Sequence, residues 1–250
     1  MSIEWRDHGT SNEGVTTRGF EIAGRRDTIY GNLWTPSNAS GPLPLVLIGH
    51  GGGGSKAVET VVANARGFVT EHGLAAAAID APGHGERGGV QGRTPEYYAL
   101  WADGTIMTDD ATADWQLTLT TLLATGLFDA DRVGWSGMSM GSLIGVPYLA
   151  AEPRIKVAAL GLCGVAGSTP GRSNIGGLLV ERAPLVNIPV IFMMQWNDER
   201  FTRDGCLSLF DLLGTRDKRL VVHLGAHAAM PEEGRIQARA FVAGRLKGSS

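Results

Sequence analysis

The sequence has few of the features that mark secreted, membrane-bound or disulfide-stabilised proteins. Its 250 residues include only two cysteines, Cys163 and Cys206, which are far apart and form no C-x-x-C pair. We therefore expect two buried free thiols rather than a disulfide framework. No apolar run reaches the roughly 20 residues that span a bilayer, so a membrane is not an expected partner.

An excess of one charge is also absent. The 22 Lys and Arg residues nearly balance the 25 Asp and Glu residues, giving a net charge of −3. No basic block stands out, which argues against nucleic acid as a partner. Residues 1–8 lack a basic segment followed by an apolar one, so a secretory signal is not indicated and a cytoplasmic location is expected.

What the sequence does have is a regular alternation of strand-like and helix-like segments. Strands are predicted at 15–22, 28–34, 43–49, 74–80, 132–135, 156–162, 189–195 and 219–224, the first two as an antiparallel pair. Helices are predicted at 57–72, 109–126, 139–151, 204–213 and 232–247. This order predicts an α/β fold with a mostly parallel eight-stranded sheet flanked by helices. No repeat or low-complexity linker divides the chain, so residues 1–250 are expected to form a single domain.

The most informative motif is Gly137-Met138-Ser139-Met140-Gly141, directly after the predicted strand at 132–135. A G-x-S-x-G sequence between a strand and a helix places a serine hydroxyl on a tight turn. A serine is a poor nucleophile unless a base removes its proton, so partners are needed. The alternative is an ordinary serine at the start of a helix.

A base and an acid follow in the order that such a site requires. His227 comes just after the last predicted strand, whereas His223 lies inside that strand and is expected to be held in the sheet. Asp198 is the first carboxylate after the strand at 189–195, with Glu199 next to it as the alternative. The order Ser139, Asp198, His227 is nucleophile, acid, base, as in a catalytic triad.

A glycine-rich segment, His50 to Ser55, follows the strand at 43–49. Glycines let the backbone approach a substrate closely, and backbone N–H groups can hold an oxyanion. We expect an oxyanion hole from Gly51, Gly52 or Gly53, with Gly52 favoured, together with the N–H of Met140. Phosphate binding is disfavoured because the segment fits neither nucleotide-binding glycine pattern.

Four further residues are candidates for substrate binding. Met138 and Trp196 flank the predicted catalytic segments, and Tyr98 and Trp101 lie in the irregular stretch 83–108. Packing in the core is the alternative for the methionine and for the two aromatic residues at 98 and 101. No metal site is expected, because the sequence holds no H-E-x-x-H pattern and no Cys/His array.

Together these elements resemble the α/β-hydrolase family, and the match spans nearly the whole chain. The segment Asp80 to Gly85 also looks like the D-x-x-G-x-G turn common in that family. The compact size and the lack of a large cap domain resemble the dienelactone-hydrolase-like and small serine esterase branches. Dienelactone hydrolases often carry cysteine where this chain has Ser139, which favours ordinary carboxylic esters. The resemblance implies an α/β-hydrolase fold, no cofactor and a small-molecule ester substrate.

Several alternatives stay open at this point. The same triad serves thioesterases, lactonases and amidases, and selectivity among them lies in the shape of the pocket. A small-molecule receptor on the same fold is the alternative outside enzymes. A homodimer is possible, since strands at the edges of the sheet could pair with a second copy.

Overall fold

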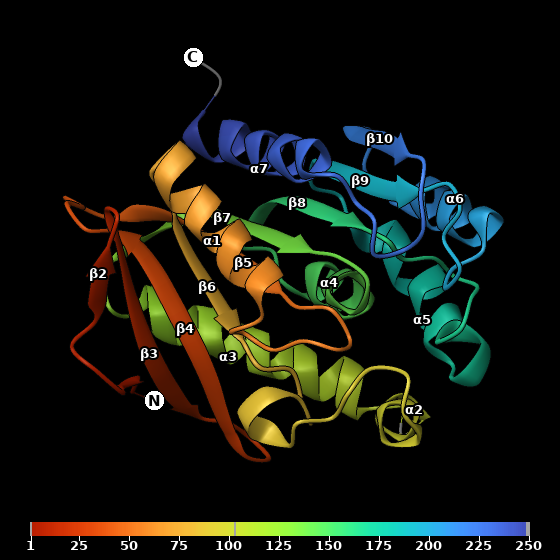
Figure 1. The fold of residues 1–250 in the computed structure, drawn as a ribbon, viewed down its shortest axis with the longest axis horizontal. Helices are drawn as coiled ribbons and strands as arrows, with labels where there is room; N and C mark the ends of the chain where they lie inside the picture. The colour runs from red at the N-terminus through yellow and green to blue at the C-terminus, as the bar shows by residue number, and fades with distance from the viewer. Residues whose placement is uncertain (1, 103, 249–250) are drawn as a thin grey trace.

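In the computed structural model, which describes residues 2–102 and 104–248, the strands form one mixed sheet (Figure 1). The strands are β1 (Glu4–Trp5), β2 (Thr10–Asn12), β3 (Val15–Ala23), β4 (Thr28–Pro36), β5 (Leu43–Gly49), β6 (Ala75–Ile79), β7 (Phe128–Gly137), β8 (Ile155–Gly161), β9 (Val190–Gln195) and β10 (Lys218–His223). Their order across the sheet is β1-β3-β4-β6-β5-β7-β8-β9-β10, and β2 pairs with β3.

The sheet is parallel from β6 to β10 and antiparallel at its N-terminal side. The strands β6, β5, β7, β8, β9 and β10 pair in parallel, whereas β1, β2, β3 and β4 pair in antiparallel fashion. The predicted α/β architecture, the mostly parallel sheet and the antiparallel opening pair are therefore confirmed. The predicted number of strands was too low, because β1 and β2 span only two and three residues and are too short to show an alternating pattern.

Helices cover both faces of the sheet. They are α1 (Glu59–His72), α2 (Pro95–Ala102), α3 (Ala111–Leu123), α4 (Met140–Ala151), α5 (Ile175–Arg182), α6 (Arg203–Leu212) and α7 (Glu232–Lys247). Helices α1 and α7 lie side by side on one face, and α3 and α4 pack on the other (Figure 1). In the described residues, no helix is both long and apolar enough to cross a membrane.

The apolar central strands divide their side chains between two cores. On β5, Leu45 and Leu47 pack with α3 and α4, whereas Val46 and Ile48 pack with α1 and α7. Successive residues of a strand point to opposite faces, so a strand buried on both faces must be apolar throughout. This explains why 43–49 is a continuous apolar run, and the predicted bounds of this strand match the observed ones.

Two helices were not predicted. Helix α2 lies in the stretch 83–108, which was expected to be irregular, and α5 lies between the predicted strands at 156–162 and 189–195, where no helix was predicted. Each is eight residues long and is flanked by Gly, Pro or Ser, so the helical period is too brief to be recognised. The predicted helix at 109–126 is shorter, because a π-helical turn at Ile106–Asp110 precedes α3.

The parallel strands bring the loop segments that follow them to one end of the sheet, where the strands have their carboxyl ends. Strands β5, β7, β9 and β10 end at Gly49, Gly137, Gln195 and His223. In an open α/β sheet, ligands bind outside these carboxyl ends. The segments that begin at residues 50, 138, 196 and 224 therefore meet at that end.

Candidate active site

Ser139 stands on a sharp turn between β7 and α4. Its φ of 57° and ψ of −118° are unusual for a residue with a side chain, and its N–H donates to the Gly161 carbonyl at 2.9 Å. Such a backbone conformation costs about 1–3 kcal/mol and persists only where its surroundings enforce it. A Cβ on Gly137 would lie 2.5 Å from the Gly141 oxygen, and a Cβ on Gly141 would lie 2.4 Å from the Gly49 oxygen. The two glycines of the motif are thus required by close backbone contacts.

His227 and Asp198 complete a hydrogen-bonded row with Ser139. The Nε2 atom of His227 lies 2.9 Å from Ser139 Oγ, and its Nδ1 atom lies 2.7 Å from Asp198 Oδ2. An ionised carboxylate only accepts, so Nδ1–H donates to Asp198 and Nε2 is left to accept the serine proton. The His227 and Asp198 side chains are only 5% and 3% exposed, which shields both contacts from water.

Asp198 is held in its ionised form. Burial acts to raise the pKa of this carboxyl, but the hydrogen bonds it accepts outweigh burial and lower the pKa below its ordinary value. Beyond His227, the donors are the backbone N–H groups of Arg200 at 2.8 Å and Phe201 at 3.1 Å to Oδ1. A carboxylate bound in this way can both orient the imidazole and stabilise its protonated form.

Glu199, the alternative acid, has a different position. Its Oε2 accepts the backbone N–H of His227 at 2.8 Å and does not contact the imidazole. This contact lowers the pKa of Glu199 and fixes the loop that carries His227. His223 is paired within β10 opposite Gln195, as expected.

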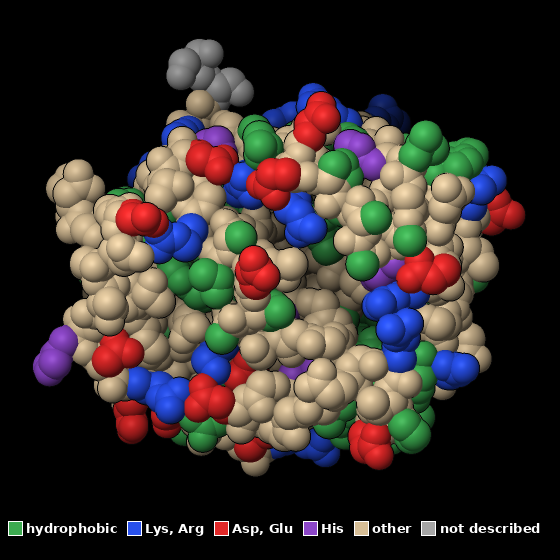
Figure 2. All heavy atoms as spheres, in the orientation of Figure 1, with side chains coloured by type: hydrophobic (Ala, Val, Ile, Leu, Met, Phe, Trp, Pro, Cys, Tyr) green, Lys and Arg blue, Asp and Glu red, His purple; other side chains and the backbone are tan. Residues whose placement is uncertain are grey.

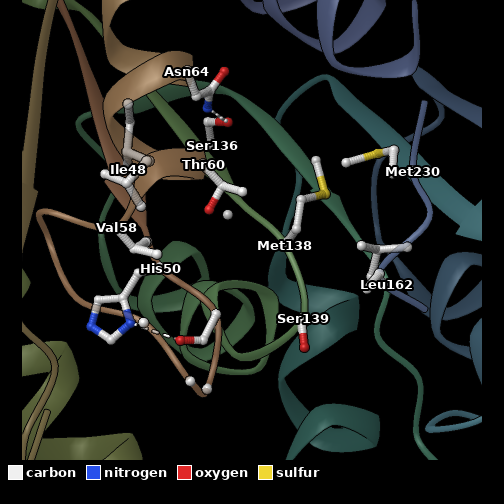
Figure 3. A pocket seen from close by; sticks show the side chains of 18 of the residues that line it. Ile48, His50, Val58, Thr60, Asn64, Ser136, Met138, Ser139, Leu162 and Met230 are labelled. Carbon is white, nitrogen blue, oxygen red and sulfur yellow. Dashed lines mark hydrogen bonds between the residues drawn. The ribbon is translucent and has the colours of Figure 1, made fainter. Parts of the chain in front are cut away.

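The glycine segment after β5 is held against the serine by His50. The Nδ1–H group of His50 donates to the Gly51 carbonyl at 2.8 Å (Figure 3). Its Nε2 atom accepts the Ala81 N–H at 3.0 Å. Burial lowers the pKa of His50 to about 4, so the ring stays neutral and keeps both contacts. The C=O and N–H of a trans peptide point in opposite directions, so the Gly52 N–H points away from the His50 ring.

The neighbours of Gly52 leave no room for a side chain there. A Cβ on Gly52 would lie 2.9 Å from the Tyr97 ring, and one on Gly92 would lie 2.7 Å from the Gly52 oxygen. Gly51, Gly52 and Gly53 all line the same cavity as Ser139. The N–H of Met140, at the first turn of α4, has no partner within that helix and is a second available donor.

A network of ion pairs lies next to the glycine segment. Lys56 donates from Nζ to Asp80 Oδ2 at 2.8 Å and to Glu86 at 2.6 Å, and its backbone N–H donates to Asp80 Oδ1 at 2.8 Å. Arg6, near the N-terminus, donates to both oxygens of Glu86 at 2.8 Å. These contacts link Lys56, which follows the glycine segment, to Asp80 and Glu86, and through Glu86 to Arg6, which follows β1.

A cavity of about 350 Å³ opens beside Ser139, between α1 and α7. Figure 3 shows Met138, Leu162 and Met230 on one side of it and Val58 and Thr60 on the other, with Asn64 and Ser136 hydrogen-bonded to each other at 3.1 Å. The space-filling view shows this face hollowed near its middle, with basic side chains at the edge of the hollow (Figure 2). The walls are mainly apolar, as small-molecule sites usually are.

Only one of the four predicted substrate-binding residues lines this cavity. Met138 does, whereas Trp101 is 2% exposed and packs on Tyr97 in the core. Tyr98 is half-buried beneath the Arg172 guanidinium, and Trp196 is 41% exposed beneath that of Arg203. Trp101 therefore takes the position given as its alternative, packing in the core.

Sequence reasoning did not single out most residues of the cavity lining, and two of them lie close to the predicted catalytic residues or strands. Arg200 lines the cavity although its position, two residues after Asp198, carries no motif. Leu162 also lines it, with an unusual φ of 49° directly after β8. Among the described residues, no cluster of three His, Cys, Asp or Glu side chains could hold a metal ion.

Comparison with known proteins identifies the family. No protein-family model and no curated protein match the sequence. A solved structure of a cold-adapted esterase from an Arctic intertidal metagenomic library is 35% identical, with a TM-score of 0.86, over 97% of this chain and 99% of that one.

More distant structures share the fold alone. Acetyl xylan esterase 1 from Thermoanaerobacterium sp. JW/SL YS485 is 16% identical, with a TM-score of 0.77, over 96% of this chain and 87% of that one. A 2,6-dihydroxy-pseudo-oxynicotine hydrolase is 17% identical, with a TM-score of 0.70, over 91% and 67% of the two chains. With the esterase match over nearly its whole length, the chain belongs to the esterases of the α/β-hydrolase fold and is a carboxylic ester hydrolase.

Proposed function

We propose that the chain cleaves small carboxylic esters through a triad of Ser139, His227 and Asp198, with an acyl-enzyme intermediate. The observation that carries the proposal is the row of two hydrogen bonds, 2.9 Å and 2.7 Å, that joins the three side chains beside the 350 Å³ cavity. We also propose a place in the dienelactone-hydrolase-like or small serine esterase branch, on the compact size of the chain and the serine nucleophile.

The chemistry follows from the donors and acceptors of the site. His227 Nε2 takes the Ser139 proton as Oγ attacks the ester carbonyl, and the N–H groups of Gly52 and Met140 stabilise the resulting oxyanion. The imidazolium then gives its proton to the leaving alcohol, which breaks the ester bond and leaves the acyl group on Ser139. Water, deprotonated by His227, attacks the acyl-enzyme and releases the acid.

Asp198 makes the sharpest test of this mechanism. In Asp198→Asn, the amide oxygen can still accept the Arg200 and Phe201 N–H groups, but an NH₂ donor faces His227 Nδ1. The ring must then carry its proton on Nε2, where it cannot take the serine proton. We expect kcat to fall by about 10³–10⁴-fold with little loss of stability.

The assay is hydrolysis of p-nitrophenyl esters of increasing acyl length, with Ser139→Ala as the inactive reference. Asp204→Asn, the same exchange at an exposed site in α6, is the matched control and should keep full activity. A fluorophosphonate probe should label Ser139 in the unmodified protein. Absence of both labelling and ester turnover in the folded protein would refute the triad and favour a non-catalytic receptor. Turnover of only thioesters, lactones or amides would keep the triad and refute the ester substrate.

A further inference from the structure

A second and much smaller cavity also opens on Ser139. Its volume is about 20 Å³, room for a group of the size of one or two water molecules. Arg200 and Arg93 line it together with three residues besides Ser139 that carry a hydroxyl, Tyr97, Ser168 and Thr169. Arg200 lines the large cavity too, so it stands where the two cavities meet at the reacting serine.

The backbone of Arg200 is firmly held. Its N–H donates to Asp198 Oδ1 at 2.8 Å, and its carbonyl accepts the Ser168 N–H at 2.7 Å. A Cβ on Gly167 would lie 2.2 Å from the same carbonyl, so the neighbouring chain passes in direct contact. The start of the Arg200 side chain is therefore fixed by contacts that do not involve its charge.

The guanidinium group of Arg200, in contrast, has only weak contacts with acceptors among the described residues. Its Nε atom is buried and has no hydrogen-bond partner among the described residues. Nε forms a long ion pair of 3.6 Å with Glu199 Oε1, on a carboxylate that is 53% exposed and whose other oxygen accepts the His227 N–H. A buried N–H group without a hydrogen bond is costly, and a ligand that accepts a hydrogen bond from Arg200 would reduce that cost.

The lining of the small cavity selects among possible occupants. A methyl group would fit by size, but it would offer no hydrogen-bond acceptor to the two arginines of the lining. A carboxylate has a similar size and pairs with a guanidinium through charged hydrogen bonds. No Asp or Glu side chain is among the described residues that line this cavity, so nothing in the lining repels an anion.

We propose that the small cavity is a carboxylate subsite in which Arg200 determines specificity. The preferred substrates are then monoesters of short dicarboxylic acids, with the carboxylate one or two carbons from the ester carbonyl. The free carboxylate of the acid part lies in the small cavity, and the alcohol part extends into the 350 Å³ cavity. This inference rests on the proposed function, since it assigns the substrate class of the same serine.

The test compares two esters of equal shape. Monoethyl succinate carries a carboxylate where ethyl 4-methylpentanoate carries an isopropyl group, and the release of acid from each is followed in a pH-stat. We expect kcat/KM to be at least 10-fold higher for the succinate ester in the unmodified protein. We expect Arg200→Gln to lower the ratio of the two kcat/KM values by about 10–100-fold. Arg200→Lys keeps the charge without the planar fork and should restore part of that ratio.

A matched control removes the same charge three residues away. Arg203 stacks on the exposed ring of Trp196 at 3.9 Å and lines neither cavity in the described structure, so Arg203→Gln should leave the ratio unchanged. A preference for the isopropyl ester in the unmodified protein, which needs no variant, would overturn the subsite. An equal loss on both esters in Arg200→Gln would also overturn it, because Arg200 would then act only by positioning the Asp198 loop. If no ester is hydrolysed at all, the proposed function itself fails.

Discussion

Replacement of Gly141 by alanine should disturb both halves of the site at once. Gly141 is the second residue of α4, and its added Cβ would lie 2.4 Å from the carbonyl oxygen of Gly49 and 2.9 Å from the carbonyl carbon. Gly49 is the last residue of β5 and leads into the glycine segment that holds Gly52. The methyl group should therefore push the turn that carries Ser139 away from the glycine segment.

The size of the effect follows from the contact distances. Real Cβ atoms essentially never come within 3.0 Å of another atom, so the 2.4 Å contact must open by about 0.6 Å (3.0 minus 2.4), and both partners are backbone. Overpacking of this kind costs about 1–3 kcal/mol. Against it stands the gain of about 0.5–1 kcal/mol from replacing a helical glycine by alanine. Displacements approaching 1 Å at reacting groups can cost about 100-fold in rate, so we expect a loss of at least about 10-fold in kcat/KM.

Gly244→Ala is the control for this experiment. Gly244 lies in α7, and nothing lies within 4 Å of a Cβ at that position. The same exchange should raise Tm by about 1–4 °C without changing activity, since about 1 kcal/mol shifts Tm by about 2–4 °C in a chain of this size. Thermal unfolding and p-nitrophenyl acetate hydrolysis of the two variants are measured side by side. If Gly141→Ala is as stable and as active as Gly244→Ala, the argument that backbone contact couples the turn that carries Ser139 to the glycine segment is refuted.

Two other predictions concern buried titratable groups. Burial lowers the pKa of His50 from 6.5 to about 4. Between these pH values the unfolded chain binds a proton at this residue and the folded chain does not. Acidification from pH 6.5 to 4 should therefore lower the free energy of unfolding by about 3 kcal/mol. In urea unfolding, the free energy of unfolding of His50→Gln should fall less steeply with falling pH than that of the unmodified protein. Equal slopes for the two proteins would contradict a buried, neutral His50. Burial raises the pKa of Cys206 to about 12 and that of Cys163 well above its usual range. Both thiols should resist a disulfide reagent at pH 8 until the protein is denatured, and rapid reaction of either in the folded protein would argue against their burial.

The sequence indicated the parts of the fold that depend on local pattern. The strand at 43–49 was predicted with its observed bounds because it is buried on both faces and therefore uniformly apolar. The end of α1 was recognisable because Gly73 adopts the left-handed conformation, with φ of 65°, that closes a helix. Both cysteines are free and buried, as predicted.

Features that depend on contacts distant in sequence could not be predicted. The role of His50 in holding Gly51 becomes visible only when the Ala81 N–H is seen to meet the other ring nitrogen. For Trp101 the sequence left substrate binding and core packing open, and only the tertiary structure shows that it is buried in the core. The exposure of Arg200 to both cavities likewise depends on a turn fixed by Asp198, which no pattern in the sequence reveals.

The spread of the site along the chain has a consequence for how the protein folds. The proposed catalytic groups around Ser139 come from residues 52, 140, 198 and 227, and each follows a different strand in the parallel part of the sheet. Pairing of distant strands requires the closure of long loops, which makes such folding slow. During synthesis at about 5–20 residues per second, Ser139 is made several seconds before His227. Under the proposed triad, a nascent chain therefore displays Ser139 without its base, and activity requires that the segment after the last strand reach the serine.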